Sequence, residues 1–432
     1  MTQATAAEFV GSPWQIPPMR SLAVLAVLLA ATPALADSKP AEFLDEAKQL
    51  MIVGACAKGE APKVKADVIA EHCKKVTAEQ EEWKKSWLGA AGPFFKSHVP
   101  SAIPKVVVYP FAGGDLATAL TVFPDADEIT TLALEPAGDP RSLGRMNEFD
   151  LKKALAVVAS ELEYLYRSSF SKTMNMINAM RAGQLPTQLV FSLSALQMHG
   201  YELVGVRYFK LDAGGDIVYL TDAEATAAEK IRDIGARNRA FGNVEIKFKK
   251  PGKAKDQIFR HIAANLDNTH IQSYGPPLKH LEKKGKVSAM TKAASYLLSY
   301  GDFSTFRDYL IKHAEWMVSD TTGIPPSYGM PAGWEYETFG DWKSSNMAAG
   351  NGAVRSTWQA LYQQQPGKAL AFRFGYPNGN GDGHLIIAKK TGNKQAAPLL
   401  RWEKGPQPAP PKAPQKDTDK VPGPVLAPKP VK

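Results

Sequence analysis

Three acidic residues and two glycines have types and spacings that could support chemistry. Gly113, Gly114 and Asp115 follow one β-branched run, and Glu135 and Asp139 follow a second. If both runs are parallel strands, the five residues converge at the carboxyl ends, where open α/β sheets bind their ligands. Paired carboxylates there could perform acid/base catalysis or bind a cation. The alternative is structural: Asp115 caps a helix, and the other two acids belong to turns.

The elements that must position these residues form a βαβ pattern. Residues 105–111 read as a strand, 116–123 as an apolar helix and 128–134 as a second, parallel strand. This start is Rossmann-like, because Glu135 follows Gly113 by 22 residues, where a ribose hydroxyl would be held. The turn lacks the third glycine of the dinucleotide fingerprint, so we expect no cofactor.

The rest of the sequence predicts a mixed α/β fold. Periodic apolar residues predict helices over 41–100, 149–180, 187–198 and 277–318. Strands are expected over 201–211, 216–220, 243–249 and 257–266, which makes the middle of the sheet antiparallel, and in a hairpin of 369–375 with 384–388. The stretch 319–350 reads as an aromatic-rich loop.

The N-terminus has the three parts of a signal peptide. Arg20 precedes an apolar run over 21–31, and the triplet Ala34-Leu35-Ala36 provides a cleavage site before Asp37. The proline-containing first 18 residues suit neither a charged leader nor a folded segment, so we expect translation to start at Met19. The predicted location is the periplasm or the medium, where nucleotide cofactors are scarce.

These patterns predict four regions along the chain: a signal peptide over 1–36, a helical N-terminal extension over 37–103, an α/β domain over 104–402 and a disordered tail over 403–432. The tail is rich in proline and lysine and cannot build a core.

Composition places the chain among ordinary globular proteins. It is 44% hydrophobic and 22% charged, with a formal net charge of +9. No second apolar run approaches membrane-spanning length, so a soluble monomer is expected after cleavage. The positive charge suits an anionic envelope polymer or a small polar ligand. Nucleic acid is an unsuitable partner for an exported protein whose lysines are dispersed.

Two cysteines support an oxidising compartment. A disulfide between Cys56 and Cys73 is the favoured interpretation. A metal site that adds His72 is disfavoured, because adjacent side chains diverge on a helix.

Two further segments could bind ligands. The loop Asn378–His384 alternates oxygen-bearing residues with glycine but lacks the closing glutamate of a calcium loop, so a hairpin turn is favoured. Aromatic residues among acids could stack on carbohydrate or simply pack: Trp334, Tyr336, Phe339 and Trp342. The common hydrolase, metalloprotease and NTPase motifs are absent from the sequence.

Several short motifs resemble those of a group of uncharacterised exported bacterial proteins. They lie at Tyr109–Asp115, Phe123–Ala126, Leu134–Gly138, Lys292–Leu298 and Asp320–Pro325. The sequence departs from the group's pattern at Gly114, Thr321 and Thr322, where the group has proline, acid and serine. Asp320 is a further candidate ligand-binding residue, provided that it shares a cleft with Asp115 and Glu135. The resemblance supports the fold boundaries and the exported location only. It implies no activity.

The sequence therefore favours a non-catalytic envelope protein that binds a ligand or a wall component. A secreted hydrolase that acts on glycans or peptides through carboxylates is one alternative. A methyltransferase-like fold that lacks its cofactor is another.

Overall fold

The structure is a computed structural model and describes residues 39–60, 66–169, 185–340, 352–365, 367–375 and 384–399. The expected signal peptide and proline-rich tail lie outside these residues. So do Trp342 and all of the loop 378–384 except His384.

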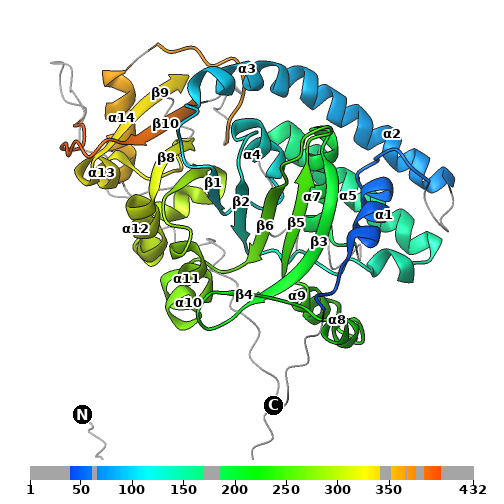
Figure 1. The fold of residues 1–432 in the computed structure, drawn as a ribbon. Coiled ribbons are helices and arrows are strands. Elements are labelled where there is room, and N and C mark those ends of the chain that lie inside the picture. Colours follow the sequence, from blue (N-terminus) through cyan, green and yellow to red (C-terminus); the bar gives the residue numbers. More distant parts are fainter. Residues whose placement is uncertain are drawn as a thin grey trace, which may run out of the picture. The chain divides into compact units, whose positions relative to one another are not determined.

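The described strands form one ten-stranded mixed sheet (Figure 1). They are β1 Val106–Pro110, β2 Glu128–Ala133, β3 Glu202–Leu211, β4 Ile217–Tyr219, β5 Asn243–Lys249, β6 Gln257–Ala263, β7 Val287–Thr291, β8 Ala314–Ser319, β9 Trp334–Gly340 and β10 His384–Lys390. Their order is β4-β3-β5-β6-β2-β1-β7-β8-β10-β9. The strands β6, β2, β1, β7 and β8 are parallel, and antiparallel strands flank them on both sides. The chain order reverses at β1, which lies between β2 and β7.

Helices cover both faces of the sheet. They are α1 Leu44–Val53, α2 Ala66–Trp83, α3 Gly89–His98, α4 Leu116–Val122, α5 Glu148–Ser168, α7 Thr187–Met198, α8 Asp222–Glu229, α9 Ile234–Ala240, α10 Asn268–Ser273, α11 Pro276–Glu282, α12 Ser304–His313, α13 Pro326–Gly329 and α14 Gly352–Gln364. A π-helical turn, Lys84–Leu88, joins α2 to α3.

Side chains of β1 alternate between two cores, as strand geometry requires. Val107 and Tyr109 belong to the core formed with α1, α2, α3, α4, α5, α7 and α8. Val108 belongs to the core on the other face, formed mainly with α10, α11, α12 and α14. The parallel strands are therefore buried on both sides, which explains their nearly continuous apolar sequences.

Several expectations about the C-terminal half were wrong. The segment 277–318, expected to be helical, contains the strands β7 and β8, and the expected loop 319–350 contains β9. Residues 369–375 form no hairpin with β10, which pairs instead with β8 and β9. These pairings join segments far apart in sequence, so local patterns carry little information about them. The expected middle strands, in contrast, are confirmed: β3, β4, β5 and β6 pair with one another in antiparallel fashion, and β6 also pairs with β2 in parallel.

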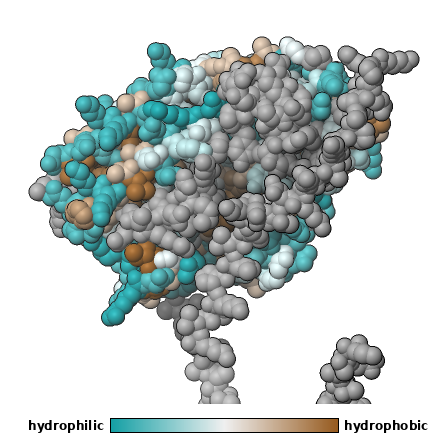
Figure 2. All heavy atoms as spheres, turned by 180° about the vertical axis from the view of Figure 1, so that it is seen from behind, coloured by the Kyte–Doolittle hydropathy of each residue, from teal (hydrophilic) through white to brown (hydrophobic). Residues whose placement is uncertain are grey.

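The large apolar side chains that are exposed in the described part of the chain are Leu134, Phe149, Val218, Tyr274, Tyr300 and Leu399. In Figure 2, hydrophilic residues dominate the coloured part of the face, and apolar residues occupy small areas between them. Among the described residues, no helix combines the length and the apolar character needed to cross a bilayer.

Candidate functional site

The carboxyl ends of β1 and β7 bring an acid and a base together inside the protein. Asp115 follows β1 and forms an ion pair with Lys292, which follows β7. Their side chains are 3% and 0% exposed. Because β1 is the strand at which the order reverses, this pair lies where doubly wound sheets usually leave a ligand crevice.

Asp115 is surrounded by hydrogen-bond donors. Its Oδ1 accepts from the Thr118 hydroxyl at 2.6 Å, and its Oδ2 accepts from the Tyr109 hydroxyl at 2.9 Å. It also caps α4 by accepting from the backbone N–H of Thr118. The expected capping role is therefore present, but it accounts for only one of several contacts. Burial, followed by the charges of Asp115 and Asp320, raises the pKa of Tyr109 well above its usual value, so Tyr109 remains a donor.

Lys292 is equally enclosed. Its ammonium group donates to the Thr118 hydroxyl at 3.1 Å and to the Ser169 hydroxyl at 3.4 Å. It also lies 5.3 Å from the centre of the Phe374 ring. Together with the ion pair, these contacts supply the partners that a buried ammonium requires.

Asp320 extends the polar cluster to the end of β8. The backbone N–H of Ala293, next to Lys292, donates to its Oδ2 at 3.1 Å, and the N–H of Thr322 donates to its Oδ1 at 2.8 Å. The hydroxyl of Thr322 also donates a hydrogen bond to Oδ1 of Asp320. A Cβ atom built on Gly375 would lie 1.7 Å from Oδ2 of Asp320. Backbone groups thus close around this carboxylate.

Thr321 contacts His384, the first residue of β10. Its hydroxyl lies 2.7 Å from Nε2 of His384. Burial lowers the pKa of His384, although the charge of Asp320 opposes this shift. Asp115, Lys292 and Asp320 all lie in motifs on which the resemblance rests, so three distant motifs meet at one edge of the sheet.

Helix α7 covers the glycine turn, which the sequence suggested as part of a ligand site. A Cβ atom built on Gly114 would lie 2.2 Å from the ring of Phe191, and the amide of Gln188 donates to the carbonyl of Gly113 at 2.9 Å. Nearly every residue of α7 is buried. The turn is therefore occupied by protein and offers little space for a phosphate or a nucleotide.

Glu135 and Asp139 have surroundings of their own. Glu135 is fully buried, and its carbonyl accepts from Nε2 of His261 at 2.6 Å. Asp139 forms ion pairs with Arg145 and with Arg237, the latter at 3.2 Å. Burial raises the pKa of Asp139, and the two arginines only partly oppose it. The ion pairs of Asp139 fit a structural role. The hydrogen bond at Glu135 belongs to its backbone and assigns no role to its carboxylate.

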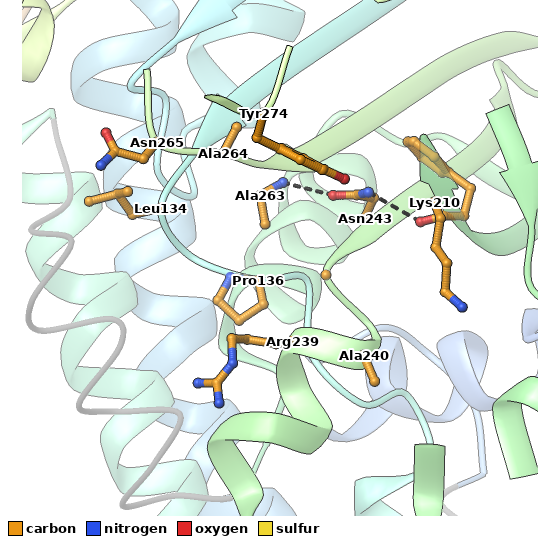
Figure 3. Close-up of a pocket in the computed structure, with 12 residues that line it drawn as sticks. Leu134, Pro136, Lys210, Arg239, Ala240, Asn243, Ala263, Ala264, Asn265 and Tyr274 are labelled. Carbon is orange, nitrogen blue, oxygen red and sulfur yellow. Dashed lines mark hydrogen bonds between the residues drawn. The ribbon is translucent and has the colours of Figure 1, made fainter. Parts of the chain in front are cut away.

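An open pocket of about 350 Å³ lies beside the buried cluster, at the carboxyl ends of β2 and β6 (Figure 3). Leu134 and Pro136 line it on either side of the buried Glu135. Tyr274 and Leu134 are 56% and 53% exposed. Two cations, Arg239 and Lys210, also line the pocket. Its volume is within the range of small-molecule sites.

The pocket wall offers few groups for catalysis. Its lining residues include no carboxylate, histidine, thiol, serine or threonine. Asn243 is held by the backbone, since it donates to the carbonyl of Phe209 at 3.2 Å and accepts from the N–H of Ala263 at 3.0 Å. The pocket can thus supply positive charge, amide groups and an aromatic ring, which suit binding. Sequence reasoning missed Lys292, Arg239 and Tyr274. Lys292 lies in a recognisable motif but follows a strand that was not predicted, and Arg239 and Tyr274 lie in no recognisable motif.

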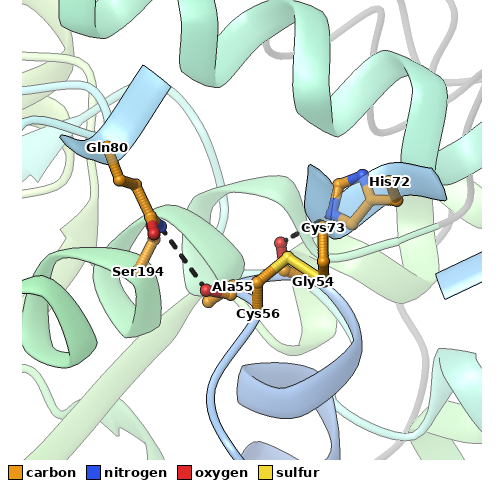
Figure 4. The surroundings of a disulfide bond; sticks show 7 residues. All are labelled: Gly54, Ala55, Cys56, His72, Cys73, Gln80 and Ser194. Atoms are coloured by element: carbon orange, nitrogen blue, oxygen red, sulfur yellow. Dashed lines mark hydrogen bonds between the residues drawn. A yellow bond between two sulfur atoms is a disulfide. The ribbon is translucent and has the colours of Figure 1, made fainter. Parts of the chain in front are cut away.

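The two cysteines lie at disulfide-bonding distance, with Cα atoms 5.3 Å apart (Figure 4). His72 and Gln80 fix the same loop, because they bond to the carbonyls of Gly54 and Ala55. His72 and both sulfur atoms are close enough to share a metal ion. A bond between the sulfurs leaves no thiolate for such an ion.

The aromatic segment of β9 is a core element. Trp334, Tyr336 and Phe339 are 1%, 6% and 4% exposed. Buried rings cannot stack on a carbohydrate, so of the two alternatives the structure shows packing for these three residues.

Comparisons of the chain with protein-family models, curated proteins and solved structures found no match.

Proposed function

We propose that this protein is an exported envelope protein that binds a small anionic ligand from the cell wall without catalysing a reaction. The observation that carries the proposal is the contrast between two adjacent parts of one sheet edge. At β1 and β7 the charged groups Asp115 and Lys292 neutralise each other. At β2 and β6 an open pocket presents Arg239 and Lys210.

The chemistry of this pocket favours a carboxylate-bearing ligand. Arg239 is exposed, and guanidinium groups bind carboxylates through paired, charge-assisted hydrogen bonds. Lys210 adds a second positive charge, although Glu224 lies 3.1 Å from its ammonium group. The exposed ring of Tyr274 offers an apolar surface for a sugar or an alkyl group. Peptidoglycan fragments combine these features, because they carry sugars and free carboxylates.

Export belongs to the same proposal. The leader pattern before Asp37 supports it, and a disulfide between Cys56 and Cys73 would be typical of an oxidising compartment. The net charge of +9 would hold the protein near anionic envelope polymers.

The binding proposal is tested by calorimetric titration of the full chain with a soluble disaccharide-tripeptide fragment of peptidoglycan. We expect Arg239→Glu to weaken binding at least tenfold, because a charge-assisted bond contributes about 1.5–3 kcal/mol. Arg232→Glu makes the same charge change at an exposed residue outside the pocket lining and should leave the affinity unchanged. No binding by the unaltered protein, or equal binding by both variants, would refute the proposal.

A methyltransferase-like fold without its cofactor is the second candidate. The order β6-β2-β1-β7-β8-β10-β9, with only β10 antiparallel to the rest, favours it, because this is the strand arrangement typical of S-adenosylmethionine-dependent methyltransferases. Phe191 and Gln188 occupy the space beside the glycine turn. Titration with S-adenosylhomocysteine should therefore give no signal, and micromolar binding would favour a working cofactor site.

The hydrolase alternative has less support. A catalytic carboxylate must reach its substrate, whereas Asp115 is 2% exposed and Glu135 is 0% exposed.

A further inference from the structure

A second pocket lies at the opposite edge of the sheet, at the amino-terminal end of β1. It has a volume of about 560 Å³ and is bounded by α3, the end of α4 and the turn that follows α4. Its wall is largely apolar, with contributions from Leu88, Phe95, Ile103, Val107, Leu120 and Phe123. This pocket shares no lining residue with the one between β2 and β6.

The charged residues of this second pocket are mostly positive. Lys96, Lys105 and Lys250 line it, and Asp125 is the one acid among the lining residues. Asp125 lies 3.8 Å from the ammonium group of Lys250. Lys96 and Lys105 are exposed and form no ion pair with any residue in the described part of the chain. Two cations are therefore available to an anionic group at the pocket.

Two further polar side chains of the pocket, Thr121 and His199, are hydrogen-bonded within the protein and carry no charge at physiological pH. The hydroxyl of Thr121 donates to the carbonyl of Ala117 at 2.9 Å. His199 lies 3.1 Å from the same carbonyl, and burial lowers its pKa to about 4, so it is neutral at physiological pH. A sugar or a peptide would leave its own polar groups without partners against the apolar wall, at a large desolvation cost.

We infer that this pocket binds a straight-chain carboxylate, with the alkyl chain against the apolar wall and the carboxylate near Lys96 and Lys105. This inference is independent of the wall-ligand proposal. The volume lies within the range of small-molecule sites. Burial of each methylene gives about 0.8 kcal/mol, which is about fourfold in affinity.

The inference is tested by calorimetric titration of the full chain with octanoate, decanoate and laurate below their micellar concentrations. We expect one laurate per chain and about fourfold tighter binding for each added methylene. Dodecanol should bind at least tenfold more weakly than laurate, and dodecyltrimethylammonium more weakly still. Absence of laurate binding, or equal affinity for all three head groups, would overturn the inference.

Two variants test whether laurate binds in this pocket. A Cβ atom on Gly92, which lines the pocket, would meet only Leu88, at 3.8 Å, so Gly92→Leu should partly fill the space and weaken laurate binding at least tenfold. Gly89→Leu is the matched control on the same helix, because Gly89 is exposed and does not line the pocket. Unchanged binding in a folded Gly92→Leu variant would overturn the inference.

Because Pro93 disfavours a side chain before it in a helix, the folding of Gly92→Leu must be checked by circular dichroism. Lys105→Glu tests the position of the laurate carboxylate independently, since this exposed residue can change without disturbing the core. We expect it to weaken laurate binding about tenfold and to leave dodecanol binding unchanged. Lys74→Glu on exposed α2 surface is its control, and an equal effect of the two charge changes would contradict the assigned position of the carboxylate.

Discussion

Lys292 and Asp115 form a buried ion pair that joins the end of β7 to the end of β1. The pair connects β1, the strand at which the chain order reverses, to its neighbour β7. It occupies the place where many doubly wound proteins bind a ligand. The same edge has its open pocket one strand further along, between β2 and β6.

Removal of one partner of this pair should be costly. Asn caps a helix about as well as Asp, so loss of the cap alone predicts a small effect for Asp115→Asn. Because the substitution leaves Lys292 buried without a counter-ion, we expect a loss of about 3–5 kcal/mol. Chemical denaturation of the purified variant measures this loss.

The double variant Asp115→Asn/Lys292→Met separates the ion pair from the cap. It removes both charges, so it should lose less free energy of unfolding than the sum of the two single variants. Additive losses would show that the two residues act independently.

Gly114 should not tolerate a side chain. The Cβ atom of Gly114→Ala would overlap the Phe191 ring, and overpacking of this kind costs about 1–3 kcal/mol. Gly144→Ala is a suitable control, because a Cβ atom there meets no atom within 4 Å. Phe191→Leu should restore part of the lost stability to Gly114→Ala. Wild-type melting of Gly114→Ala would mean that α7 does not cover the turn.

The disulfide should contribute to stability. Cys56 and Cys73 are 17 residues apart, and closure of a loop of this length gives about 3 kcal/mol in the chain-entropy model. Replacement of both cysteines by serine should lower the free energy of unfolding by a similar amount. Mass spectrometry of the exported protein under non-reducing conditions tests the bond directly, and two free thiols would disprove it.

Acid should destabilise the protein in two steps. Burial lowers the pKa of His199, His261 and His280 to about 4, whereas an unfolded histidine titrates near 6.5. Between these values the unfolded chain binds more protons than the folded one, so stability falls as the pH falls from about 6.5 to 4.

Glu128 extends the loss of folding stability to lower pH. Burial opposes its ionised form, but Lys284 and Arg260 outweigh burial and lower its pKa to about 2. Its stabilising effect is complete above about pH 4.5 and disappears as the pH falls towards 2. Denaturation midpoints between pH 8 and pH 3 measure both steps, and His261→Gln should reduce the slope above pH 4. A flat profile from pH 7 to 4.5 would contradict the buried neutral histidines.

The signal-peptide pattern leads to a separate prediction. Cleavage after Ala36 gives a mature protein that begins at Asp37. Edman sequencing of the exported form should read Asp-Ser-Lys-Pro, and an exported chain that retains residues 1–36 would rule this out.

The sequence predicted those elements whose patterns are local. The bounds of α7 and β5 match the expected ranges, and β1, α4 and β2 differ by one residue or less at each end. In contrast, β7 is buried on both faces and contains Ser288, Ala289 and Met290, so it shows neither alternation nor strong β-propensity. Because β7 was missed, the role of Lys292 could not be predicted.

The sequence of β9 alternates as a strand should, but the segment was interpreted as part of an aromatic-rich loop. Trp334 and Tyr336 alternate with Glu335 and Glu337, which is the period of a half-buried strand. The pocket beside Arg239 depends on α9, β3 and β6 meeting in space, and no local pattern encodes that meeting.

The comparison that tests the account most directly is peptidoglycan-fragment binding by Asp115→Asn/Lys292→Met and by Arg239→Glu, both verified as folded by circular dichroism. In the proposed function the buried pair is structural and the pocket binds the ligand. We therefore expect wild-type affinity for the double variant and at least tenfold weaker binding for Arg239→Glu. Loss of binding in the folded double variant, with full binding by Arg239→Glu, would contradict the proposed function.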